Sequence, residues 1–543
     1  MDNDNTGTGK KITIPRNMNE IMRQAIGDYL KANPVLPEEE EMEADCLAII
    51  RNDIAMYNCN TSKDNKLRIP VVLSEYGIAQ LLLKKYHIVN VCFDGLAESA
   101  YSPLAIYIED GEKAGTYSLD ENDLKKVIVR LNNSITQRGI NEVLNKIKLD
   151  ASNVYPCTEP NLIAVNNGIF DFDTKTLLPF TPDKVFLSKS KVNYNPNAKN
   201  ITIHNPDDGT DWDVESWMND LSDDKEVVEV LWQILGAIIR PNVPWNKSAW
   251  FYSESGNNGK GTLCELMRQL CGEGSYKSIK LEEMGKEFLL EPLVGASAII
   301  VDENDVGTYI DKAANLKAIV TSDVIQINRK FKQPISFRFR GFMVQCLNEM
   351  PRVKDKSDSF FRRQLFIPFT KCFTGVERKY IKQDYLKRTE VLEYVLYKVL
   401  NMNYYELSTP DVCKDALEEY KEFNDPILQF VNEILPQLQW DLVPFTFLYS
   451  LYRAWFDKYV PSGSPQARNT FIKDLLIALK DNDTWECKDK NAKVASANRM
   501  DKPEWLIDEY KLEDWYSQTY KGNDRAKRCC PSLQASYRGI VRK

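Results

Sequence analysis

A segment rich in glycine and asparagine follows the apolar run Trp250-Phe251-Tyr252 and precedes a stretch, residues 263–270, with the apolar spacing of a helix. A glycine-rich turn between a strand and a helix suits phosphate binding, because it offers free backbone N–H groups at the positive end of the helix dipole. Lys260 lies where the lysine of such a loop reaches the β and γ phosphates. The candidate ATP-binding residues are Gly256, Asn257, Asn258, Gly259, Lys260, Gly261 and Thr262.

This loop departs from the common phosphate-loop pattern at two positions. Glu254 stands where a first glycine is usual, and Gly261 stands where a serine or threonine usually follows the lysine. Thr262 is therefore the candidate hydroxyl for holding Mg²⁺. An ordinary Gly/Asn turn without a ligand is the alternative interpretation.

Two carboxylates follow the next strongly apolar run. Residues 298–301 predict a buried strand that ends at Asp302 and Glu303. At the C-terminal end of a parallel strand these acids would face the crevice where phosphates bind. We expect Asp302 to hold Mg²⁺ through water and Glu303 to orient and activate the attacking water. Many apolar strands end in Asp, so the pattern is informative only together with the glycine loop.

Further polar residues flank two later apolar runs. Asn348 ends the run 342–347, and we expect it to help Glu303 position water, with a turn-forming asparagine as the alternative. Arg362 and Arg363 precede another apolar run. A guanidinium of this kind can stabilise charge on a γ-phosphate across a subunit boundary. One of the two is predicted to be an arginine finger, and the sequence does not choose between them.

Asp171 and Asp173 raise a different possibility, the paired acids of a two-metal polymerase or primase. Their spacing is equally that of a turn, and no companion carboxylate or histidine is nearby. We therefore favour the turn.

The elements that must position these residues predict an α/β fold. Short apolar runs alternate with helical stretches between residues 244 and 369, which is typical of a parallel sheet. Residues 77–83 predict a helix and 87–93 a strand in an N-terminal α+β region. Amphipathic helices at 443–458 and 469–480, with strand pieces near Trp485 and Val494, favour a winged-helix-like domain. The predicted divisions are an N-terminal domain at 1–155, a pre-ATPase segment at 156–240, an ATPase core at 241–375, a helical linker with the winged-helix-like domain at 376–520, and a basic tail at 521–543.

Composition limits the classes of protein that fit. The net charge of −8 argues against nucleic-acid binding by the whole surface. Residues 317–363 hold eleven Lys/Arg against four Asp/Glu, so a local DNA contact is expected there. Twelve cysteines without a CxxC pair, and only two histidines, argue against a zinc site and for reduced thiols; Cys529 and Cys530 in the tail stay open. The sequence has no apolar stretch long enough to span a bilayer and no signal-peptide core, which predicts a cytoplasmic protein without membrane contact.

These motifs, in this order, resemble the superfamily 3 helicases, specifically the phage and plasmid primase-helicase family that also includes the poxvirus primase-helicase. The resemblance covers about residues 161–369, with a looser likeness to about 520. Asn167-Gly168-Ile169-Phe170-Asp171 looks like the family's pre-ATPase segment, and Gly-Thr after the lysine is a familiar variant of its loop. Within the family the arrangement is most similar to the replicative helicases of staphylococcal cassette chromosomes and related mobile elements. The resemblance implies an AAA+ core at about 241–375.

The resemblance also implies a β-hairpin that projects into the central channel of a ring. Its tip would be Lys330-Phe331-Lys332, where the lysines grip phosphates and the phenylalanine stacks on a base or sugar. An exposed basic hairpin without a partner is the alternative.

The expected function is that of an ATP-dependent DNA helicase, a homo-hexamer that uses ATP and Mg²⁺ and acts on single-stranded and forked duplex DNA in the replication of a mobile element or phage. The N-terminal region lacks a convincing constellation of primase carboxylates, so we expect no primase activity and a separately encoded primase or polymerase as partner. The main alternative is an AAA+ ATPase that regulates or remodels proteins. A small-molecule P-loop kinase is a second alternative, which the basic hairpin and paired arginines disfavour.

Overall fold

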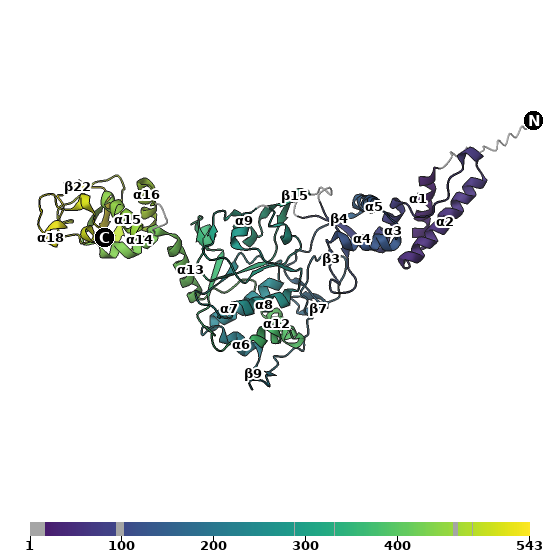
Figure 1. Cartoon of the computed structure of the whole chain (residues 1–543), viewed down its shortest axis with the longest axis horizontal. Helices are drawn as coiled ribbons and strands as arrows, with labels where there is room; N and C mark the ends of the chain where they lie inside the picture. Colours follow the sequence, from purple (N-terminus) through teal and green to yellow (C-terminus); the bar gives the residue numbers. More distant parts are fainter. Residues whose placement is uncertain (1–16, 94–101, 287, 331, 460–464, 481) are drawn as a thin grey trace, which may run out of the picture. The chain divides into compact units, whose positions relative to one another are not determined.

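The computed structural model describes the chain except residues 1–16, 94–101, 287, 331, 460–464 and 481. The chain forms two compact units, of which the first contains Met1–Asp355 and Arg362–Cys413 and the second contains Lys356–Phe361 and Lys414–Lys543. Figure 1 follows the elements from purple at the N-terminus to yellow at the C-terminus.

The N-terminal part of the first unit combines helices with a small sheet. The helices are α1 (Met18–Ala32), α2 (Glu39–Cys59), α3 (Glu75–Lys85), α4 (Glu121–Leu131) and α5 (Gln137–Asp150). The strands β1 (Ile88–Val91), β2 (Leu104–Tyr107), β3 (Tyr117–Ser118) and β4 (Ser152–Val154) lie in the order β3-β2-β1-β4. The helix and strand predicted at 77–83 and 87–93 are confirmed as α3 and β1. Ser74 caps α3 by accepting from the Gly77 backbone N–H, which ends the preceding loop.

A five-stranded parallel sheet forms the centre of the first unit. Its strands are β10 (Ser248–Tyr252), β11 (Tyr276–Lys277), β12 (Ala298–Val301), β16 (Phe342–Leu347) and β18 (Gln364–Pro368), in the order β11-β12-β16-β10-β18. Every pairing in it is parallel. The strands predicted at 298–301 and 342–347 are confirmed as β12 and β16, and the structure shows that they are neighbours. Because β10 lies between strands that come later in the chain, the carboxyl edge beside it is a topological switch point, where α/β sheets bind ligands.

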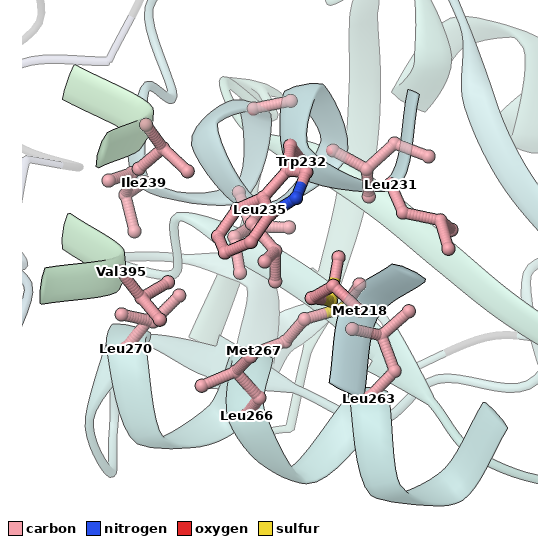
Figure 2. Close-up of a cluster of buried hydrophobic side chains, with 14 of the residues drawn as sticks. Met218, Leu231, Trp232, Leu235, Ile239, Leu263, Leu266, Met267, Leu270 and Val395 are labelled. Atoms are coloured by element: carbon pink, nitrogen blue, oxygen red, sulfur yellow. The ribbon is translucent and has the colours of Figure 1, made fainter. Parts of the chain in front are cut away.

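One face of the helix after β10 is buried against two other helices. Leu263, Leu266, Met267 and Leu270 of α8 (Lys260–Cys271) face side chains of α7 (Lys225–Ile239) and Val395 of α12 (Thr389–Asn401), as Figure 2 shows. Their spacing is the i, i+3, i+4, i+7 pattern of an amphipathic helix. This packing fixes the axis of α8, and therefore the direction in which its N-terminus points.

The same core joins segments that the sequence had assigned to separate domains. A single buried cluster extends from Ile163 through α7 and the sheet to Leu400 and Cys413. The predicted boundaries at residues 240 and 375 therefore do not separate domains in the structure. The physical reason is that α7, α8 and α12 each have an apolar face that only the others cover.

The pre-ATPase segment begins with the antiparallel strands β5 (Leu162–Val165), β6 (Gly168–Asp171) and β7 (Thr176–Leu178). Asp171 accepts hydrogen bonds from the backbone N–H groups of Asp173 at 3.0 Å and Thr174 at 3.3 Å, and from Asn161 at 3.3 Å. Asp171, the last residue of β6, thus stabilises the turn that follows the strand. Among the described residues, no group of three or more His, Cys, Asp or Glu side chains is placed to hold a metal ion. The hairpin β8 (Ile203–His204) and β9 (Asp211–Trp212) follows, then α6 (Val214–Asp220).

A long insertion separates β12 from β16. It contains β13 (Tyr309–Ile310), which pairs with β17 (Arg352–Val353), α9 (Ala314–Val320), and the antiparallel hairpin β14 (Val324–Arg329) and β15 (Lys332–Arg338). Ile325, Ile327 and Phe337 of the hairpin are buried, whereas Val324 is exposed. The alternation fixes which face of the hairpin packs inward.

The C-terminal unit contains α14 (Pro426–Ile434), β19 (Leu442–Pro444), α15 (Phe445–Tyr459), α16 (Arg468–Ala478), β20 (Trp485–Glu486) and β23 (Gly539–Arg542). Its sheet has the order β19-β23-β20. The predicted helices at 443–458 and 469–480 are confirmed as α15 and α16. The predicted basic tail at 521–543 is not a separate tail, because Ile540 is buried in this core and β23 is the central strand. The piece near Val494, β21 (Val494–Ala495), pairs instead with β22 (Ser536–Tyr537).

Within the described part of the chain, none of the helices combines the length and the apolar character needed to cross a bilayer. The cysteines are all free thiols, with Cys529 buried and Cys530 exposed.

Candidate nucleotide site

The glycine loop leaves the carboxyl end of β10 and ends in α8, which begins at Lys260. Gly259, directly before the helix, has a φ of +88°, and a Cβ added to it would lie 2.6 Å from Leu221 Cδ2. Asn257 adopts a left-handed φ of +53°. Both the backbone conformation and the close packing of Leu221 therefore require glycine at 259. The loop and helix N-terminus have the form predicted from sequence.

Lys260 is buried, with 5% of its surface exposed. Its ammonium donates to the Asn348 side-chain oxygen at 3.1 Å and to the Ser253 carbonyl at 3.4 Å, and both acceptors are neutral. Burial lowers the pKa of Lys260. A phosphate would supply the negative charge that a buried ammonium favours.

Asp302 follows β12 and is held by an arginine of α8. Arg268 forms two contacts with its carboxylate, at 3.2 Å and 3.1 Å. Burial raises the pKa of Asp302, but the hydrogen bonds and charge of Arg268, with a smaller contribution from Lys382, outweigh it, so the pKa lies below its ordinary value of 3.8. The carboxylate is therefore ionised and oriented at the edge of the sheet.

The acids after β12 are kept in place by Asn304. Its buried amide donates to Gln345 Oε1 at 2.9 Å and to the Cys346 carbonyl at 3.0 Å, both on β16. Glu303, between Asp302 and Asn304, is exposed. The residues before and after Glu303 are thus held by hydrogen bonds, while the side chain of Glu303 itself is exposed.

A cavity of about 670 Å³ adjoins the N-terminus of α8. Gly259 and Thr262 contribute to one part of its wall, and Trp217 and Phe373 to another. A volume of this size lies within the range of small-molecule sites, about 300–1,000 Å³. The cavity therefore extends from the glycine loop to an aromatic surface.

The segment after β18 covers the glycine loop. The Phe373 backbone N–H donates to the Asn257 carbonyl at 2.8 Å. The Asn257 side chain donates to Thr374 at 3.2 Å and to Glu377 at 3.0 Å. These contacts hold Asn257, the left-handed residue of the loop. The chain then continues into α11 (Lys379–Gln383), which also lines the cavity.

Arg362 and Arg363 are not part of this cluster. They directly precede β18, whereas Lys260, Asp302 and Asn348 follow β10, β12 and β16. Since these strands are parallel, the arginines lie at the opposite edge of the sheet, about 15 Å away for a five-residue strand. Arg362 is exposed and Arg363 partly buried. Neither is placed to contact a phosphate on the glycine loop of its own chain.

The predicted hairpin tip lies between β14 and β15, where Arg329 is paired with Lys332. Lys330 is exposed, Phe331 lies outside the described residues, and Lys332 begins β15. A strand-turn-strand at this position agrees with the sequence prediction.

Sequence reasoning missed several residues of the site. Arg268 could have been found from its spacing, because it lies two helical turns after Lys260 in the helix that follows the glycine loop. Asn304, Trp217 and Lys382 gave no such signal, because only the folded chain brings them to the cavity or the strand ends.

Three family models match parts of the chain. "Family of unknown function (DUF5906)" matches residues 251–363, which include the glycine loop and both arginines. "D5 N terminal like" matches residues 80–223, and "Poxvirus D5 protein-like" matches residues 422–516 in the C-terminal unit. The matches therefore extend over both units, with gaps between them.

Among curated proteins, the chain is 27% identical over 278 residues to an Acanthamoeba polyphaga mimivirus protein described as a "putative helicase", covering 49% of this chain and 28% of that protein. It is 24% identical over 381 residues to a protein of Invertebrate iridescent virus 3 with the same description, covering 62% and 39%. The chain thus spans less than half the length of these relatives.

Among solved structures, the A form apo structure of the NrS-1 C-terminal region is 13% identical, with a TM-score of 0.39, and covers 75% of this chain and 90% of that one. A second apo structure of the same region is 12% identical, also with a TM-score of 0.39, and covers 75% and 89%.

Proposed function

We propose that the chain is an ATP-dependent DNA helicase of the superfamily 3 type, with an AAA+ core that translocates on single-stranded DNA. The observation that carries the proposal is the convergence of Lys260, Asp302, Glu303 and Asn348 at one edge of a parallel sheet, beside a cavity of nucleotide size. The names of the viral relatives support the helicase assignment.

ATP fits this site chemically. Its phosphates would lie on the loop at the α8 N-terminus. The Lys260 ammonium would then donate to phosphate oxygens in place of its present neutral acceptors. The base would lie toward Trp217 and Phe373. Asp302 and Thr262 would hold Mg²⁺, which neutralises phosphate charge when bound. Glu303 would take the proton of the attacking water, with Asn348 orienting that water.

A ring of subunits would complete the site. Because Arg362 and Arg363 lie at the edge of the sheet opposite the glycine loop, an arginine finger must act on the phosphate of a neighbouring copy. Arg362, the exposed member, is the better candidate. A homo-hexamer is the assembly proposed.

DNA would contact two regions. The Lys330-Phe331-Lys332 hairpin tip would track the strand in the channel by phosphate contacts and stacking. The elements α14, β19, α15, α16, β20 and β23, with further short elements between β20 and β23, are consistent with a winged helix. The C-terminal unit is therefore proposed to bind duplex DNA, with exposed Arg468 and Lys473 on α16.

The biological setting proposed is replication of a mobile element or phage, of the kind seen in staphylococcal cassette chromosomes, together with a separately encoded primase or polymerase. Primer synthesis by the purified chain would contradict the second part.

The test is ATP hydrolysis by the purified chain with and without single-stranded DNA, alongside unwinding of a forked duplex. DNA-stimulated hydrolysis with unwinding, both abolished in Lys260→Ala, would support the helicase. Hydrolysis indifferent to DNA, without unwinding, would favour the alternative, a protein-remodelling or regulatory AAA+ ATPase.

A further inference from the structure

A second lysine reaches the phosphate end of the cavity. Lys382, on α11, lines the same cavity as Gly259 and Thr262. Its ammonium nitrogen lies 3.7 Å from the position that a Cβ on Gly261 would occupy. The lysine therefore stands over the first turn of α8, at the residue where the loop departs from the usual Ser/Thr.

The ammonium of Lys382 lies close to the positive end of a helix. The N-terminus of α8 carries about +0.5 charge from the helix dipole, and the first residue of this helix is the buried Lys260. Among the described residues, Lys382 has no ion-pair partner, whereas Lys371 and Arg388 in the same stretch pair with Asp223 and Asp384. Lys382 thus adds a cation without an ion pair to the cavity wall at a positive helix end, which is a favourable place for an anion.

Three of the four acids that line the cavity have partners other than Lys382. Asp213 accepts from Asn200 and Ser216, Asp211 contacts His204, and Glu377 accepts from Asn257 and the Gly375 N–H. Asp220, also in the wall, is exposed. Asp302 is the acid close enough for Lys382 to favour its ionised form, and Arg268 already engages both of its oxygens.

We propose that Lys382 is a second phosphate ligand of the nucleotide site, donating to the phosphate chain of a bound nucleoside triphosphate from α11. This rests on the proposed nucleotide site and adds a residue that the glycine-loop motif does not contain. Gly261 has a role in this arrangement, because a serine or threonine there would add side-chain atoms between the Lys382 ammonium and the first turn of α8.

The consequence is that two segments bind the phosphates. Lys260 belongs to the loop after β10, and Lys382 to the segment after β18 that already hydrogen-bonds Asn257. A bound triphosphate would join these segments by a charge-assisted contact at each end. A nucleoside without phosphates would leave Lys382 without a ligand.

The test uses the full chain and calorimetric titration with Mg–ATP and with adenosine. Lys382→Gln is compared with Lys387→Gln, which removes the same charge from an exposed residue outside the cavity. We expect Lys382→Gln to weaken Mg–ATP binding about tenfold, the size of one lost charge-assisted hydrogen bond, and to leave adenosine binding unchanged. Lys382→Arg should retain most of the affinity, and Lys387→Gln should bind like wild type.

The role of Lys382 would be overturned if Lys382→Gln and Lys387→Gln bound ATP with equal affinity. The nucleotide site itself would still be supported if wild type bound ATP and Lys260→Ala abolished that binding. An equal loss of adenosine and ATP affinity in Lys382→Gln would show a structural effect and also overturn the role of Lys382. A wild-type chain that binds no ATP would overturn both proposals. If ATP binding depended on Lys382 but the chain did not unwind DNA, this inference would be supported and the helicase assignment would be contradicted.

Discussion

The Lys260 ammonium donates a 3.1 Å hydrogen bond to the side-chain oxygen of Asn348, which links the glycine loop after β10 to the end of the neighbouring strand β16. The two residues are far apart in sequence but meet because their strands are parallel neighbours. Without nucleotide, the amide oxygen of Asn348 accepts the hydrogen bond of the Lys260 ammonium. A bound phosphate would compete for the ammonium and release Asn348 to hold water beside Glu303.

Removal of the Lys260 ammonium is expected to abolish catalysis. Lys260→Ala should lower the ATP hydrolysis rate by roughly 10²–10³-fold or more, since it removes the buried cation that would stabilise charge on the phosphates. Steady-state phosphate release measures the change. Wild-type turnover in the variant would contradict the assignment of the loop.

Glu303→Gln should separate binding from chemistry. The amide keeps the shape of the side chain but cannot accept the proton of the attacking water, so hydrolysis should fall by about 10²–10⁴-fold while the Kd for ATP changes little. Single-turnover hydrolysis and ATP titration on the same preparation give both quantities. If Asp302→Asn retained ATP affinity and Glu303→Gln lost it, the two roles would have to be exchanged.

The hairpin tip should couple hydrolysis to DNA. The double variant Lys330→Ala, Lys332→Ala should keep basal hydrolysis and lose its stimulation by single-stranded DNA. Loss of two phosphate contacts should make the slope of log K against log salt shallower by about 1.4 for a single strand. Lys225→Ala with Lys387→Ala removes the same charge from exposed positions elsewhere and should behave like wild type. Normal unwinding by the hairpin variant would exclude the proposed channel contact.

Arg362 should act between subunits. Arg362→Ala should bind ATP normally and lose about 10³–10⁵-fold in hydrolysis, whereas Arg363→Ala, at a partly buried position, should not show this pattern. Mixing Arg362→Ala with Lys260→Ala should restore part of the activity, because each variant supplies what the other lacks. No recovery on mixing, in preparations shown to form mixed rings, would argue against a finger in trans.

Asp123 gives the N-terminal helices a defined pH dependence. Burial alone would raise its pKa, but hydrogen bonds from Ser118, Lys126 and Lys113 lower it from 3.8 to about 2. A depressed pKa stabilises the fold above the unfolded value, and this contribution is lost as pH falls from 3.8 toward 2. The shift corresponds to about 2 kcal/mol at neutral pH.

Asp123→Asn should therefore accelerate amide hydrogen exchange in α4 at pH 7, when compared with wild type at the same pH. The difference should shrink when the two proteins are compared at pH 2 to 3, where the Asp123 carboxylate becomes protonated. Glu121→Gln, on the same first turn but more exposed and paired with Lys125, is the control and should change exchange little. A difference that persists unchanged at pH 2 would show that the Asp123 charge is not its origin.

The sequence alone determined the residues of the loop and the strands that carry the acids. Trp250 to Thr262 and Ala298 to Glu303 are local patterns, in which apolar runs, glycines and charged ends define strand, turn and helix without long-range information. The helices α15 and α16 were predictable for the same reason, whereas the hairpin around Lys330 was expected from the family resemblance.

Only the tertiary structure decided which residues meet. The strand order places β16 between β12 and β10, which brings Asn348 to Lys260, and puts Arg362 at the opposite edge of the sheet. The apolar faces of α7, α8 and α12 are buried against one another, so the predicted domain boundaries do not separate domains. Strand β23 pairs with β19, so the segment predicted as a tail belongs to the core. Such outcomes depend on contacts between distant segments, so Lys382 could be placed above Gly261 only when the chain was folded.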